Sequence, residues 1–204
     1  MGLLVSLFIG SIIYSIILIK YFKKENIKYS KLFVGGLFIF VLYLFLVIDI
    51  TGPGHILSMG VERERVISLV PFKFQDNMFG MIANAILFIP LGVFLPSLWS
   101  KFERCLNTFL VGFFLSLAIE LLQLLNMRAT DIDDLIMNTL GTVIGFFIYK
   151  LLFKKVSKRF EVNSSSNKLW VKYNGEIFII LMLGLSFFIA PFVDNLLIKI
   201  IFGI

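Results

Sequence analysis

The feature that most constrains this chain is a series of long apolar runs. A helix needs roughly 20 predominantly apolar residues to cross the hydrocarbon core of a bilayer, and the sequence offers five runs of about that length. Hydrophobic residues make up 59% of the 204 residues and charged residues only 16%, against roughly 25% charged residues in an average soluble domain. The sequence therefore predicts an all-α, polytopic transmembrane helical bundle. The predicted core spans are Leu3–Ile19, Leu32–Ile50, Met81–Trp99, Leu106–Leu125 and Leu135–Phe153.

Composition divides the chain into three parts. A five-helix core covers residues 1–155, a basic and polar linker with the sequence NSSSN covers 156–175, and an additional segment covers 176–204. The apolar part of this last segment, Glu176–Asp194, is interrupted by Pro191, which leaves open whether it spans the membrane. The first apolar run lacks a charged region before it and a small-residue cleavage site after it, so we expect a retained helix.

Positive charge is unevenly distributed between the loops that join these spans. The first, third and fifth loops hold 5, 2 and 7 Lys or Arg residues, which together are 14 of the chain's 19. Because loops rich in Lys and Arg stay on the cytoplasmic side, we expect the N-terminus outside and the second and fourth loops facing the exterior. Membrane orientation accounts for the net charge of +6, so no nucleic-acid partner is expected.

Polar residues that a lipid-embedded helix accommodates poorly are concentrated around the fourth loop, NMRATDIDD. Charged residues near membrane helices are costly unless they are paired or hydrated, and they indicate functional sites by default. Glu120 and Gln123 are three residues apart and share a face at the end of the fourth span. Asp131, Asp134 and Asn138 are spaced i, i+3, i+7 and share a face at the start of the fifth span.

Asn84 lies in the half of the third span that enters from the same side of the membrane. The three helices therefore offer polar groups at one depth, and we predict a shared binding site near the outer interface. The candidate binding residues are Asn84, Glu120, Gln123, Arg128, Asp131, Asp133, Asp134 and Asn138.

The chemistry of this predicted site stays open. Its acids could hold a hard divalent cation such as Ca²⁺ or Mg²⁺, and no other cofactor is expected. Two acids in different environments could do acid–base work. An acidic, amide-lined pocket could instead bind a cationic or sugar-peptide headgroup. The spacing does not choose between these, and no residue is assigned a catalytic role.

Structural roles compete with these functional ones. Thr130-x-x-Asp133 is a capping-box pattern, and acids in a first helical turn complement the helix dipole. Arg128 could pair with a nearby acid to hold the loop, and the asparagines could hydrogen-bond across helices. Glu120 is the hardest to explain structurally, because an acid within an apolar run needs a partner or a proton.

Other features have simpler expectations. Pro90 and Pro96 predict a kink or a local unwinding in the third span. Gly141-x-x-x-Gly145 is a close-packing pattern and leaves open whether the chain forms a homo-oligomer. Cys105 is the only cysteine, which excludes an intramolecular disulfide, and the lone His55 in the second loop favours a solvated side chain.

Three separated motifs together resemble the VanZ-like family. They are NAILFIPLGVFLP at Asn84–Pro96, IELLQ at Ile119–Gln123, and RATDIDDLIMNTLG at Arg128–Gly141. The similarity covers about the first 155 residues, and Leu69–Phe72 also resembles a short element of the family. Ala129 and Thr130 depart from the glycine and aromatic residues often found around the arginine. The positions that match the family pattern are Asn84, Pro90, Gly92, Glu120, Gln123, Arg128, Asp131, Asp133, Asp134, Asn138 and Gly141.

The family is named after a membrane protein associated with resistance to teicoplanin, a lipoglycopeptide. The resemblance therefore implies a multi-pass protein of a bacterial plasma membrane that contributes to lipoglycopeptide resistance, and it supplies neither a mechanism nor a catalytic residue. We expect a non-enzymatic factor that engages the drug or a lipid-linked cell-wall precursor. The alternatives are a small membrane enzyme acting on a lipid-linked headgroup and a transporter, although no inverted repeat is visible.

Overall fold

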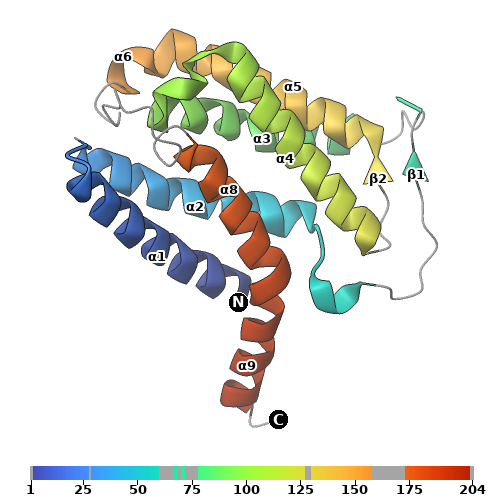
Figure 1. Ribbon diagram of the computed structural model, residues 1–204. Coiled ribbons are helices and arrows are strands. Elements are labelled where there is room, and N and C mark those ends of the chain that lie inside the picture. Colours follow the sequence, from blue (N-terminus) through green and yellow to red (C-terminus); the bar gives the residue numbers. More distant parts are fainter. Residues whose placement is uncertain are drawn as a thin grey trace. The chain divides into compact units, whose positions relative to one another are not determined.

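The computed structural model describes residues 2–27, 29–59, 67–68, 70–71, 78–126, 130–157 and 173–202. These residues form two compact units. One unit joins Met1–Met59 to Val162–Ile204, and the other is Gly60–Glu161. The ribbon in Figure 1 is coloured along the sequence.

Six helices within the described ranges are long and apolar enough to span a membrane. Each contains or closely matches one of the apolar runs in the sequence, and the only described strands are two residues long each. The predicted all-α, polytopic transmembrane bundle is therefore confirmed. The six spans are Gly2–Lys24, Lys31–Ser58, Met78–Leu98, Cys105–Leu125, Ile132–Phe153 and Asn174–Ile201.

The first unit is built from both ends of the chain. Within it, the α2 helix begins where Ser30 accepts a hydrogen bond from the Leu32 N–H at 3.0 Å. It ends at Gly52, whose φ of 54° is left-handed and suits glycine better than other residues. The elements are α1 (Gly2–Lys24), α2 (Lys31–Thr51), η1 (Ile56–Ser58), α8 (Asn174–Gly184), η5 (Leu185–Ile189) and α9 (Ala190–Phe202).

The C-terminal segment is one continuous helix from α8 to α9. Its middle, η5, is a π-helical turn that ends two residues before Pro191, a residue that has no N–H to donate. The helix is 28 residues long over Asn174–Ile201, so Pro191 does not end it and it is long enough to span. The predicted boundaries at 155 and 175 remain predictions from composition.

Helix α1 packs against this C-terminal helix, and Figure 1 shows the N-terminal end of α1 beside it. The Gly2 N–H donates to Asp194 Oδ1 at 2.5 Å, and the Tyr14 hydroxyl donates to the Asn174 carbonyl at 2.6 Å. A Cβ atom at Gly10 would overlap the Leu185 side chain. Small residues on α1 therefore allow the two helices to approach closely.

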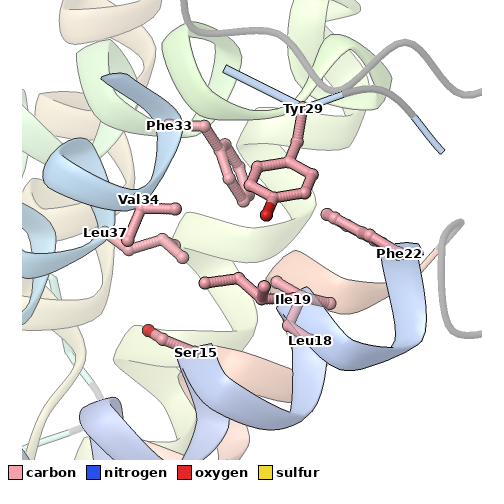
Figure 2. A pocket seen from close by; sticks show the side chains of 8 residues that line it. All are labelled: Ser15, Leu18, Ile19, Phe22, Tyr29, Phe33, Val34 and Leu37. Atoms are coloured by element: carbon pink, nitrogen blue, oxygen red, sulfur yellow. The ribbon is translucent and has the colours of Figure 1, made fainter. Parts of the chain in front are cut away.

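A gap between α1 and α2 is lined mostly by apolar side chains. Figure 2 shows the hydroxyl groups of Ser15 and Tyr29 among these apolar groups. The gap is too narrow to admit a water molecule, so it is part of the packed core and not a binding cavity. Its lining residues are Ser15, Leu18, Ile19, Phe22, Tyr29, Phe33, Val34 and Leu37.

The second unit is centred on α5, which packs against both α3 and α4. These three helices, green through orange in Figure 1, lie side by side. Two short strands pair in parallel, with Ile67 opposite Thr130 and Ser68 opposite Asp131. The elements are β1 (Ile67–Ser68), α3 (Met78–Leu98), η3 (Ser100–Glu103), α4 (Cys105–Leu125), β2 (Thr130–Asp131), α5 (Ile132–Ile148), η4 (Tyr149–Phe153) and α6 (Lys154–Ser157).

Glycines allow the backbones of α5 and α3 to approach each other closely. A Cβ atom at Gly141 would overlap the Ala85 carbonyl oxygen, and one at Gly145 would overlap the Ile89 carbonyl oxygen. Gly92 on α3 meets the carbonyl of Thr142 in the same way. The Gly141-x-x-x-Gly145 pattern is therefore a close-packing face, as predicted, and its partner is α3 of the same chain.

Helix α3 runs without interruption from Met78 to Leu98 although it contains Pro90 and Pro96. The local unwinding offered as one outcome for Pro90 does not occur. A transmembrane helix tolerates proline because neighbouring groups can satisfy the carbonyl that loses its hydrogen bond. The helix therefore carries Asn84, near its start, on a regular backbone.

Candidate functional site

The described candidate residues lie at one end of the second unit. This is the end where α3 begins, α4 ends and α5 begins. Asn84 is in the second turn of α3, and Glu120 is in the last two turns of α4. Because α4 and α5 are joined by a short loop, their polar ends meet. We call the eight predicted residues, together with Ser116, the polar cluster.

The first link in the polar cluster joins α3 to α5. The Asn84 Nδ2 donates a hydrogen bond to Asp134 Oδ1 at 2.5 Å. Both side chains are partly buried, and a hydrogen bond to a carboxylate is stronger than one between neutral groups. Asn84 and Asp134, two of the predicted binding residues, are therefore in direct contact.

The second link joins α4 to α5. Glu120 is almost fully buried, and its Oε2 accepts a hydrogen bond from the Asp131 N–H at 3.1 Å. The Asp131 side chain in turn accepts the Asp133 N–H at 3.0 Å and is the N-cap of α5. The capping residue is thus Asp131 and not Thr130, because α5 begins at Ile132, three residues before the predicted span. Asp131 has a structural role at this position.

A third link lies one helical turn deeper. The Asn138 Nδ2 donates to Ser116 Oγ at 2.9 Å, and the Thr142 hydroxyl donates to the Asn138 carbonyl at 3.0 Å. Asn138 is 2% exposed and Ser116 is fully buried. The other amide atom of Asn138, Oδ1, is a buried acceptor with no hydrogen-bond partner among the described residues.

Sequence reasoning missed Ser116. The signal was present, because Ser116 lies four residues before Glu120 and therefore on the same face of α4. It also missed Ser68, which the β1–β2 register places opposite Asp131. Pairing between two-residue strands far apart in sequence leaves no periodic signal.

The remaining predicted residues are placed as follows. Gln123 and Asp133 are buried at the same end of the unit. Arg128 lies outside the described residues, as do Leu69 and Phe72 of the short element that resembles the family. The structure therefore brings together candidate residues from three helices, without describing the arginine.

Negative charge dominates the described part of the polar cluster. The carboxylates of Asp131 and Asp134 lie near enough to Glu120 for their charges to repel that of Glu120. The Asp131 N–H and the Asn84 amide oppose this repulsion by donating hydrogen bonds. Within the described ranges no group of three or more His, Cys, Asp or Glu side chains is arranged to hold a metal ion.

Comparison with known proteins identifies the family. The model of the VanZ/LLP1 family matches residues 33–154, which is more than half of the chain and includes every residue of the polar cluster. Protein VanZ of Enterococcus faecium is 35% identical over 106 residues, which cover 52% of this chain and 65% of that protein. No solved structure matches the chain. The chain is a multi-pass membrane protein that belongs to the VanZ/LLP1 family.

Proposed function

We propose that this protein lowers the sensitivity of a bacterium to lipoglycopeptides such as teicoplanin, and that it acts through the polar cluster. The observation that carries the proposal is the joining of three helix ends by the Asn84–Asp134 and Glu120–Asp131 hydrogen bonds inside the region that matches the family. Polar groups are costly at membrane helices, so their concentration at one end of the unit supports a binding role.

The expected orientation gives this site access to its ligand. The positive-inside rule puts the α4–α5 loop on the exterior of the plasma membrane, where drug and lipid-linked cell-wall precursors meet. A protein that engages either molecule at that surface reduces the amount of drug bound to its target. The proposal needs no chemical step.

A second candidate is a small membrane enzyme acting on a lipid-linked headgroup. The observation that favours it is the proximity of the buried Glu120 to Asp131 and Asp134. Carboxyl groups in unequal environments can serve as acid and base in one reaction. In that case Glu120 and Asp134 would move protons to and from the headgroup.

The test is the teicoplanin susceptibility of a sensitive host that expresses the wild type or one of three variants, Glu120→Gln, Asp134→Asn and Arg128→Ala. Asp49→Asn is the matched control, because Asp49 is an exposed acid at the end of α2 and outside the polar cluster. Membrane levels are measured for every strain. We expect the wild type and Asp49→Asn to raise tolerance and the three cluster variants to raise it less.

The pattern of losses separates the two candidates. A binding site should lose tolerance in graded steps, since each hydrogen bond contributes a part of the affinity. An enzyme should lose nearly all of it when either acid is neutralised, since groups that act as a unit in catalysis are not additive. If the wild type never raises tolerance at normal membrane levels, the proposed function is wrong.

A further inference from the structure

One buried acceptor in the polar cluster has no partner among the described residues. Three donors of the cluster are engaged within it: the Asn84 amide with Asp134, the Asp131 N–H with Glu120, and the Asn138 amide with Ser116. The Asn138 Oδ1 is left without a partner among the described residues. Buried acceptors almost always have a donor, so this atom is available to accept a hydrogen bond from a bound molecule.

The position of Asn138 on α5 puts its side chain on the same helix face as the acids. Side chains on a helix slant toward its N-terminus, and the N-terminal end of α5 carries Asp131 and Asp134. Asn138 is one turn below Asp134 on the same face, and its amide reaches Ser116, one turn below Glu120 on α4. The Asn138 side chain is therefore at the base of the acidic end of the three helices.

Charge decides what kind of donor fits. Residues 120–138 contain four acids and one base, Arg128, for a net charge of −3. The segment 60–77, which contributes β1, holds three acids and three bases and therefore adds no net charge. The two segments together carry a net charge of −3. A cationic donor is favoured over a neutral one, because a hydrogen bond between two charged groups is stronger.

A metal ion fits this arrangement less well than an organic cation. Divalent cations need several oxygen ligands at short distance, and the described acids do not form a group of three. A primary ammonium needs only acceptors around three N–H directions. Large apolar side chains are exposed at the same end, among them Phe79 and Leu121, and they would contact an acyl chain in the bilayer.

We propose that the polar cluster binds the primary ammonium group of an amphiphilic molecule. The ammonium N–H groups donate hydrogen bonds to Asn138 Oδ1 and to the carboxylates of Glu120 and Asp134, while the apolar part of the molecule stays in the membrane. This proposal rests on the proposed function and names the chemical class of the ligand that the site takes.

The test measures binding of radiolabelled dodecylamine to the full chain in phosphatidylcholine nanodiscs, a lipid without a primary amine. Protein-free discs correct for partition into lipid, and dodecanol is the neutral probe of equal chain length. We expect saturable binding of dodecylamine and none of dodecanol. Equal binding of the two probes, or no binding above protein-free discs, overturns the proposal without any substitution.

Variants locate the site. Asp134→Asn and Glu120→Gln should each weaken dodecylamine binding about tenfold or more, and Asn138→Ala several-fold, since a hydrogen bond to a charged group is among the stronger ones. Asn107→Ala is the matched control for Asn138, because Asn107 lies at the opposite end of α4, and Asp49→Asn is the control for the acids. Wild-type affinity in all three cluster variants overturns the proposal.

The two proposals fail in different ways. A wild type that raises teicoplanin tolerance but does not bind dodecylamine refutes the ammonium ligand and leaves the proposed function standing. A wild type that binds dodecylamine through the polar cluster but never changes tolerance supports the ammonium site and refutes the proposed function.

Discussion

At the scale of single residues, Asp131 combines two roles that two substitutions can separate. Its side chain caps α5, while its backbone N–H donates a hydrogen bond to the Glu120 carboxylate. Asparagine is about as good an N-cap as aspartate, and alanine costs about 1 kcal/mol. We expect Asp131→Ala to lower the free energy of unfolding by about that amount and Asp131→Asn to leave it close to the wild-type value. The measurement is circular dichroism during titration with SDS.

The same pair tests whether the charge of Asp131 matters for function. If Asp131 only caps α5, Asp131→Asn keeps the teicoplanin tolerance of the wild type. If its negative charge contributes to ligand binding, Asp131→Asn loses tolerance at unchanged stability. Equal destabilisation by both substitutions would contradict the assigned cap.

The Asn84–Asp134 hydrogen bond is the shortest of the three links described above. Hydrogen bonds between membrane helices average about 0.6 kcal/mol and reach about 1.7 kcal/mol in double-mutant cycles. Because this one has a charged acceptor, we expect a coupling free energy of about 1 kcal/mol between Asn84→Ala and Asp134→Ala. The measurement is the unfolding free energy of the wild type, both single variants and the double variant. Additive effects, within about 0.3–0.5 kcal/mol, would show that the contact contributes nothing.

Much of the polar cluster could be predicted at this scale. Two helices joined by a short loop must bring their adjoining ends together, so the meeting of Glu120 with Asp131 follows from where the apolar runs end. Which atoms bond does not follow, because the contact uses a backbone N–H whose direction depends on the cap. Ser116 was not predicted, because a serine inside an apolar run usually donates a hydrogen bond to a backbone carbonyl of its own helix.

At the scale of helices, the glycine face of α5 fixes its distance from α3. A methyl group at Gly141 would overlap the carbonyl oxygen of Ala85, and backbone cannot move aside as a side chain can. We expect Gly141→Ala to lower the free energy of unfolding by about 2 kcal/mol or more. Gly184→Ala is the control, because no atom outside the neighbouring backbone of its own helix lies within 4 Å of its Cβ position, and a helical Gly→Ala change stabilises by up to about 1 kcal/mol.

Two other results would contradict this account of the glycines. Gly141→Ala could leave stability unchanged and convert a dimer into a monomer on size-exclusion chromatography, which would put the glycine face at an interface between two chains. Alternatively, Gly141→Ala and Gly184→Ala could have equal effects, and the overlap with Ala85 would then be relieved at no cost.

The helices themselves could be predicted because each apolar run is long and uninterrupted by charge. The start of α5 could not, because the sequence pattern places the first apolar residues at Leu135 while the helix begins at its cap, three residues earlier. The β1–β2 pairing could not either, because two residues per strand carry no periodicity. It depends on contacts between segments about 60 residues apart.

At the scale of the whole molecule, the packing of the N-terminal helix α1 against the C-terminal helix was not predictable from composition. A lipid-facing side and a helix-facing side of a membrane helix are equally apolar, so hydropathy does not show which neighbour a span has. The available signal was the spacing of small residues on α1, where Gly2 and Gly10 meet Asp194 and Leu185. The sequence suggested an added sixth helix, and in the structure that helix is the packing partner of α1.

Orientation in the membrane is the prediction on which access to the polar cluster depends. The positive-inside rule predicts that loop two faces the exterior and loop three the cytoplasm. After Cys105→Ser removes the native thiol, Met59→Cys and Ser100→Cys each place a single cysteine at an exposed position in one of these loops without changing any charge. We expect a membrane-impermeant maleimide to label Met59→Cys in intact cells and Ser100→Cys only after permeabilisation, which serves as the control for reactivity. The reverse pattern would put the polar cluster on the cytoplasmic side, where it could not meet a drug that acts on the outer surface, and the proposed function would have to be abandoned.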